Sequence, residues 1–196
     1  MQADTPQPTP STDTRYLTLA ELEAGLPAIR QSPQQEGELA MIVRRPAIEQ
    51  REVLAAGQID RLEGLVGDCW RSRGNKRTPD GAANPDAQLT LMNARVLGLL
   101  AGTPERWPLA GDQLIVDLDL SEANLPPGSR LAIGDAVVEI TALPHTGCGK
   151  FLERYGKDAV RFVNSEQGKA LRLRGVNARV VAPGAVAVGQ VVRKVL

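Results

Sequence analysis

The chain has 196 residues, with 23 Lys and Arg against 23 Asp and Glu, so its formal net charge is zero. This balance argues against a general nucleic-acid-binding protein, and no apolar stretch is long enough to span a bilayer. The length suits one domain with a real core, and aliphatic residues must fill that core because aromatic residues are few. Two cysteines cannot form a disulfide framework, and no signal peptide is recognisable, so we expect a reducing, cytoplasmic location.

The first 36 residues are predicted to be an appendage. Residues 1 to about 15 are rich in Pro, Thr, Gln, Ser and Asp, a composition typical of a disordered tail. A capping-box pattern from Thr18 to Glu21 then begins an amphipathic helix that should run to about Arg30, kinked or shortened by Pro27. A linker leads to the main domain, which we place at residues 37–196.

In the main domain, short apolar runs alternate with Gly and Pro turns. Strands are expected at 39–43, 51–54, 88–92, 113–118, 130–133, 136–140, 176–181, 185–188 and 190–195. Asn93 should cap a helix through Leu100, and residues 150–164 should form two short helices divided by Gly156. Residues 64–70 are expected to be a tight turn, and the polar residues 71–86 a mobile loop. This pattern predicts a mainly β (α+β) domain, a barrel or sandwich with a few short helices.

Cys148 is the residue most suggestive of chemistry. It lies in the run from Leu143 to Phe151, three residues from the only histidine, His145, with glycine on both sides and Lys150 close behind. A helix beginning near Lys150, and the lysine itself, should favour the reactive thiolate. The alternative is a small buried hydrophobe, as many free cysteines are. The part of the chain that begins at Cys148 has ten bases and three acids, whereas residues 105–147 have two bases and seven acids. That asymmetry suits an anionic ligand, although a merely solvated surface would explain it as well.

The C-terminal half also resembles a known family. The residues that carry the resemblance are 110–114, 117–121, 125–128, 131–134, the cysteine segment 145–151, 161–164, 173–181 and 184–190, with 42–46 and 64–70 upstream. In this order they resemble the MOSC domain, named for the C-terminal domain of molybdenum cofactor sulfurases. The resemblance covers roughly residues 37–196.

The resemblance implies a β-barrel like the barrel domain of pyruvate kinase, and binding of a molybdopterin-type cofactor with Cys148 as molybdenum ligand or sulfur carrier. Relatives reduce N-hydroxylated compounds or deliver sulfur to molybdenum. These 196 residues contain no counterpart of the sulfurases' pyridoxal-phosphate domain and no cysteine cluster for an iron–sulfur centre. Electrons or sulfur would therefore come from a separate donor protein.

Further residues are candidates for contact with such a cofactor. His145 could hold a proton for the substrate or orient an oxo group, or it could be a loop histidine bonded to backbone. Lys150, Arg172 and Arg174 could hold a phosphate, the two arginines sharing one face of a strand. Arg45 is a further candidate, and because Arg44 and Arg45 point in opposite directions on a strand, at most one of them faces a site. Asn164 and Asn177 could contact a pterin, or they could be residues of a helix end and a turn. Trp70 could form a pocket wall, with Asp68 pairing a base, or it could be a core anchor.

Three functions remain open from the sequence. The first is a molybdenum-dependent reductase component for N-hydroxylated small molecules. The second is a sulfur carrier that uses a persulfide on Cys148. The third is a module that binds an anionic cofactor without catalysis.

Overall fold

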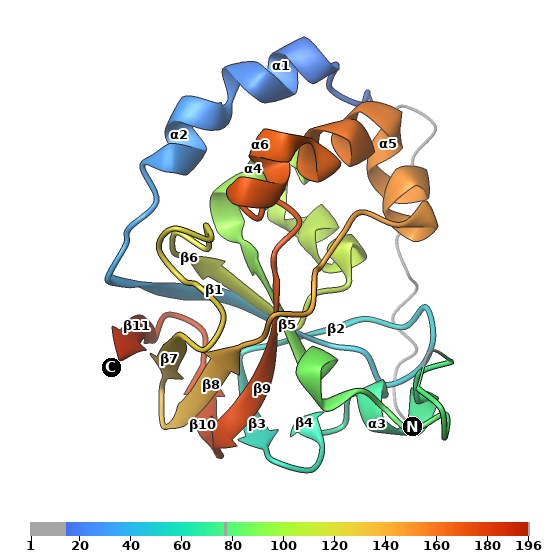
Figure 1. The fold of residues 1–196 in the computed structure, drawn as a ribbon, viewed down its shortest axis with the longest axis vertical. Helices are drawn as coiled ribbons and strands as arrows, with labels where there is room; N and C mark the ends of the chain where they lie inside the picture. Colours follow the sequence, from blue (N-terminus) through green and yellow to red (C-terminus); the bar gives the residue numbers. More distant parts are fainter. Residues whose placement is uncertain (1–14, 77, 196) are drawn as a thin grey trace.

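The computed structural model describes residues 15–76 and 78–195, and its centre is a closed barrel (Figure 1). In the order of their pairing, the barrel strands are β11 (Val191–Val195), β7 (Arg130–Ile133), β8 (Ala136–Ile140), β9 (Val176–Ala182), β5 (Leu89–Asn93), β6 (Leu114–Asp117) and β1 (Glu36–Arg44). Pairing of β1 with β11 closes the ring, and only the β5–β6 pair is parallel. The predicted mainly β barrel is thereby confirmed.

Four more strands lie outside this ring. β2 (Glu52–Leu54) extends the sheet beyond β1, and β10 (Gly184–Ala187), β3 (Ala56–Asp60) and β4 (Gly64–Leu65) form a small second sheet. The sequence patterns did not predict β3 or β4, and the expected tight turn at 64–70 in fact contains β4 and the start of the helical turn α3 (Trp70–Arg73).

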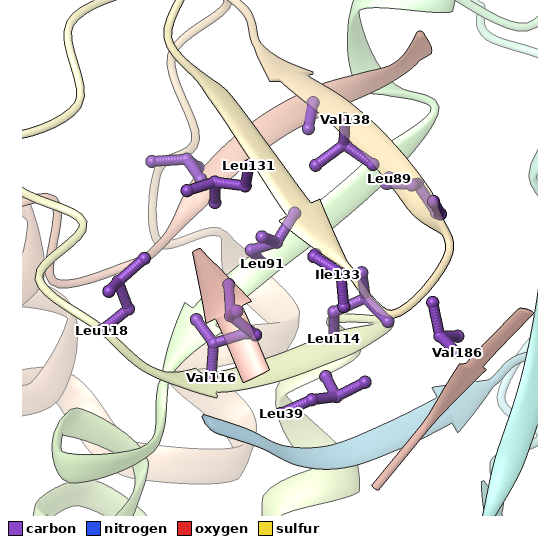
Figure 2. Close-up of a cluster of buried hydrophobic side chains, with 14 of the residues drawn as sticks. Leu39, Leu89, Leu91, Leu114, Val116, Leu118, Leu131, Ile133, Val138 and Val186 are labelled. Atoms are coloured by element: carbon purple, nitrogen blue, oxygen red, sulfur yellow. The ribbon is translucent and has the colours of Figure 1, made fainter. Parts of the chain in front are cut away.

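Aliphatic side chains fill the barrel, as the shortage of aromatic residues requires. Leu39, Leu91, Leu114, Leu131 and Val138 point inward from five different strands, and each is 0% exposed (Figure 2). Removing this apolar surface from water is the main force that closes the barrel.

Helices cover one end of the barrel (Figure 1). They are α1 (Leu19–Ala24), α2 (Leu26–Arg30), α4 (Ala94–Ala101), α5 (Gly149–Asn164) and α6 (Glu166–Ala170). A second apolar cluster joins α1 and α2 to α4 and α5. None of the helices in the described ranges is long and apolar enough to cross a membrane.

Local signals in the sequence predicted most of these helix ends. The capping box at Thr18 is present, and the Asn93 side chain caps α4. The N-terminal helix breaks at Gly25, and Pro27 lies in the first turn of α2, where its missing N–H costs nothing. Gly156 interrupts α5 with a φ of 85°, as expected for the residue that divides two short helices. The predicted tail at residues 1–14 lies outside the described residues.

The remaining helical turns border the cavity described below. α3 begins the segment expected to be a loop at 71–86, and η1 (Pro85–Ala87) ends it. η2 (Pro104–Ala110) leads into β6, and its C-cap Gly111 has a φ of 84°. These turns, like the loop after β1, lie at one end of the β1 and β5 strands.

Candidate functional site

A cavity of about 370 Å³ opens beside Cys148, and we call it the cysteine cavity. Its walls come mainly from residues 45–51 after β1, from the segment 145–154 that leads into α5, and from Arg174 with Asn177 of β9. These segments are far apart in the sequence. The barrel brings them together because β1 and β9 both belong to its wall and α5 packs across its end.

Cys148 is the N-cap residue of α5, and its side chain is exposed. The loop before it is fixed by Asn164, near the other end of the same helix. The backbone N–H of Gly147 donates to Asn164 Oδ1 at 2.9 Å, and Asn164 Nδ2 donates to the Gly147 carbonyl at 3.2 Å. Asn164 therefore holds the cysteine loop instead of lining the cavity. Cys69, the other cavity cysteine, is buried, and both cysteines are free thiols.

Positive charge dominates the lining of the cavity. Six cationic side chains contribute to it, namely Arg45, Arg51, Arg73, Lys150, Arg154 and Arg174. Glu49 is the one acidic residue among the described lining residues, which leaves an excess of five positive charges. Counting the buried Asp68 and Asp112, which pair with two of the arginines, still leaves three. Such a cavity is suited to an anionic ligand.

A buried ion pair holds Arg45 in the wall. Its Nε and Nη2 each donate at 2.8 Å to a different oxygen of Asp68, whose side chain is 0% exposed, and its Nη1 donates to the Gly111 carbonyl. Asp68 thus pairs with a base as the sequence suggested. The neighbouring Arg44 turns away and pairs with Glu52, so only one of the two arginines lines the cavity.

Trp70 lies next to the cysteine cavity but not in its lining. Its side chain is buried and borders an adjoining hollow that shares Ile48, Arg73 and Ala87 with the cysteine cavity. Its backbone N–H donates to Asp68 Oδ1, so Trp70 supports the buried pair.

Arg174 is held by a second buried pair. Its Nη1 donates to Asp112 Oδ2 at 2.7 Å, its Nη2 donates to the Ala110 carbonyl, and its guanidinium lies 4.9 Å from the centre of the Phe151 ring. The arginine is 6% exposed, yet it borders two cavities, the cysteine cavity and a second one of about 490 Å³.

The prediction that Arg172 and Arg174 share one face of a strand is wrong. Both lie in turns before β9, closed by hydrogen bonds from Leu173 N to the Gly168 carbonyl and from Gly175 N to the Arg172 carbonyl. Arg172 has a φ of 49°, which excludes an extended strand. Its side chain donates to the Leu125 carbonyl and lines the second cavity but not the cysteine cavity.

At the mouth of the cavity, Glu49 bridges two bases of α5. Its carboxylate forms ion pairs with Lys150 and with Arg154, and the hydrogen bond from Lys150 is the largest cause that lowers the pKa of Glu49. Glu49 has a φ of 66°, a rare conformation for a residue with a side chain. Burial, and then the charge of Arg154, lower the pKa of Arg51 nearby.

Sequence reasoning missed Glu49, Arg51, Arg73 and Arg154 as cavity residues. Only Arg154 carried a local signal, because it follows Lys150 by four residues on one helix face. The others depend on how the loop after β1 and the turn α3 meet α5.

His145 and Asn177 line both cavities and so form part of the wall between them. Asn177 Nδ2 donates to the Leu143 carbonyl, which fixes the start of the cysteine loop. His145 Nδ1 lies 3.6 Å from Asp112 Oδ1. Burial is the largest cause that lowers the pKa of His145, to about 3, and the positive charge of Arg174 adds to it. The imidazole is therefore neutral near pH 7.

The low pKa of His145 predicts a loss of stability in acid. Between pH 6.5, the ordinary pKa of histidine, and about pH 3, His145 is protonated in the unfolded chain but not in the folded protein. The free energy of unfolding therefore falls as the pH falls through this window. We expect His145→Gln to abolish this contribution, which is at most about 1.4 kcal/mol per pH unit. Urea denaturation of both proteins at several pH values would measure it. Parallel curves would contradict a histidine that stays neutral in the folded protein.

Comparisons with known proteins agree with this architecture. The family model of the MOSC domain matches residues 82–193. The YuaD protein of Bacillus subtilis is 17% identical, with a TM-score of 0.60 over 80% of this chain and 94% of that one. YiiM of Escherichia coli is 20% identical, with a TM-score of 0.52 over 81% and 70% of the two chains. YiiM of Geobacillus stearothermophilus is 14% identical, with a TM-score of 0.53 over 82% and 75%. A comparison with curated proteins finds no match.

Proposed function

Because the chain belongs to the MOSC domain family, we propose that the cysteine cavity binds a molybdopterin-type cofactor, with the Cys148 thiolate as a molybdenum ligand. The observation that carries the proposal is an exposed thiol on the wall of a cavity with six cationic side chains. Thiolates are soft ligands that suit thiophilic metals, and guanidinium and ammonium groups suit phosphate.

The residues present fit such a group. Lys150, Arg154 and Arg51 would hold its phosphate, and the Nε of Arg51 is buried without a hydrogen-bond partner among the described residues. Arg174 and Asn177 would meet the polar edge of the pterin, and the ion pairs of Arg45 and Arg174 keep both guanidinium groups in place. Asn164 and Trp70 lie outside the cavity lining and support it, and Arg172 lines the second cavity instead.

We propose that the protein reduces N-hydroxylated small molecules. Conversion of a hydroxylamine to an amine consumes two electrons and two protons and releases water, so the N–O bond breaks and its oxygen leaves as water. When bound, the cofactor supplies this two-electron chemistry. The electrons would come from a separate donor protein, since the chain's two cysteines cannot hold an iron–sulfur cluster. Two free thiols suit a reducing, cytoplasmic setting.

Metal and pterin analysis tests the proposal. We expect protein made in a host that synthesises the cofactor to carry molybdenum and pterin in equal amounts, and Cys148→Ala to lose most of the molybdenum. Cys69→Ala is the matched control, because it removes the chain's other thiol from the same cavity lining. Wild-type protein from that host without both components would overturn the proposal.

A sulfur carrier is the second candidate, and the exposure of Cys148 favours it. In that case a donor's persulfide sulfur is transferred to the Cys148 thiolate and the donor's thiolate leaves. Mass spectrometry would then find one added sulfur on the wild type and on Cys69→Ala, but not on Cys148→Ser. If the protein only binds the cofactor, Cys148→Ala should keep its affinity for the cofactor. The reductase and the sulfur carrier both need Cys148 and would not tolerate this change.

A further inference from the structure

Asp112, His145 and Arg174 form a buried group whose hydrogen bonding is incomplete. Asp112 is fully buried, and its Oδ2 accepts from Arg174 Nη1 at 2.7 Å. Its other oxygen, Oδ1, has no hydrogen-bond partner among the described residues, and neither has His145 Nδ1. These two atoms face each other at 3.6 Å, a few tenths of an ångström beyond a hydrogen bond.

Electrostatics decides which protonation state of His145 fits this arrangement. A bare Nδ1 lone pair would face a carboxylate oxygen and repel it, whereas an Nδ1–H would donate to that oxygen and satisfy both buried atoms. A doubly protonated ring would lie near the guanidinium groups of Arg174 and Arg45, which oppose a further positive charge. The neutral Nδ1–H form is therefore the one that the surroundings stabilise.

We propose that Asp112 is a positioning residue that holds His145 as the neutral Nδ1–H tautomer, leaving Nε2 as a hydrogen-bond acceptor in the cavity wall. Nδ1 is buried, so the 17% of the side chain that is exposed belongs to its other atoms, among them Nε2 or its neighbours. His145 lines both cavities, so this acceptor is available to a bound ligand.

The assignment changes what His145 can do. A neutral Nε2 without a proton cannot donate to an oxo group, and it is not the source of a proton for a leaving oxygen. It accepts a hydrogen bond from an N–H or O–H of the ligand, and the hydroxylamines of the proposed function carry both donors. This last step rests on the proposed function, whereas the tautomer itself is a property of the protein without any ligand.

The tautomer can be measured directly, because the chain has a single histidine. In a long-range proton–nitrogen NMR spectrum of tag-free, nitrogen-15-labelled, metal-free protein near neutral pH, we expect Nδ1 to be the protonated ring nitrogen. A protonated Nε2 with a bare Nδ1, or a doubly protonated ring, would overturn the proposal. The wild-type spectrum decides this without any variant, and it is independent of molybdenum content.

Asp112→Asn tests whether the aspartate is the cause. The side-chain oxygen of the asparagine should keep accepting from Arg174, so the side-chain NH₂ group would face His145 Nδ1 and donate to it. Nδ1 must then be the unprotonated ring nitrogen, and we expect the major tautomer to switch to Nε2–H. Asp117→Asn is the control: Asp117 pairs with Arg95 on another part of the barrel, and its loss should leave the tautomer unchanged. A folded Asp112→Asn protein with the wild-type tautomer would refute the role of Asp112.

Discussion

Replacing Asp68 with Ala should lower the free energy of unfolding by about 3–5 kcal/mol, because the change leaves the Arg45 guanidinium buried without its counter-ion. Arg45 has a side chain only 10% exposed and makes two bonds of 2.8 Å to Asp68. Asp68 also accepts from the backbone N–H groups of Arg45 and Trp70, so the carboxylate ties the end of β1 to the turn α3.

Urea denaturation at neutral pH would measure this loss. Glu23→Ala, which removes an exposed carboxylate on α1, should stay within about 0.5 kcal/mol of the wild type. The double variant Arg45→Met with Asp68→Leu should recover part of the stability, since removing both charges leaves no unpaired ion. The backbone N–H groups of Arg45 and Trp70 still lose their acceptor in this variant, so the recovery should be incomplete. If Asp68→Ala were as stable as Glu23→Ala, the ion pair between Arg45 and Asp68 would not hold this wall of the cavity.

Local patterns in the sequence predicted much of the fold. The capping box at Thr18, the Asn93 cap, the Gly156 break and the hairpin of β7 and β8 all depend on neighbouring residues, and all are present. Closure of the barrel could not be predicted in this way. It pairs residues 36–38 with residues 191–193, and no local signal specifies a contact across the whole length of the chain.

In the site, too, neighbouring residues could be predicted from the sequence, whereas contacts between distant segments could not. His145, Cys148 and Lys150 are close in sequence, and the fold adds Arg45, Arg174 and Asn177 around them, so six of the expected residues line one cavity. Arg172 fails because the hydrogen bonds of the turn at 171–175 override the strand pattern that its spacing suggested. Asp112 belongs to the segment 110–114 that carries the resemblance, but it was not expected to be a site residue, since its role depends on where the start of β6 places it relative to the turn that holds Arg174.

Replacing Arg174 with Met should also cost about 3–5 kcal/mol, this time by leaving the Asp112 carboxylate buried without its cation. Methionine keeps much of the side-chain volume against the Phe151 ring, so the loss reports charge more than packing. Urea denaturation at neutral pH against the wild type would measure it.

The pH dependence of that loss separates the charge from other effects. Burial is the largest cause that lowers the pKa of His145, the positive charge of Arg174 lowers it further, and Asp112 raises it. Removing the arginine should therefore raise the pKa of His145 and favour an imidazolium beside Asp112. The stability deficit of Arg174→Met should therefore shrink as the pH falls from about 7 to about 5, where an ordinary histidine gains its proton. The variant His145→Gln has no imidazole, so the deficit that Arg174→Met causes in this background, measured against His145→Gln alone, should stay nearly constant over that range, apart from protonation of Asp112 itself. If the deficit of Arg174→Met shrinks equally with and without His145, the histidine does not share the buried charge of Asp112.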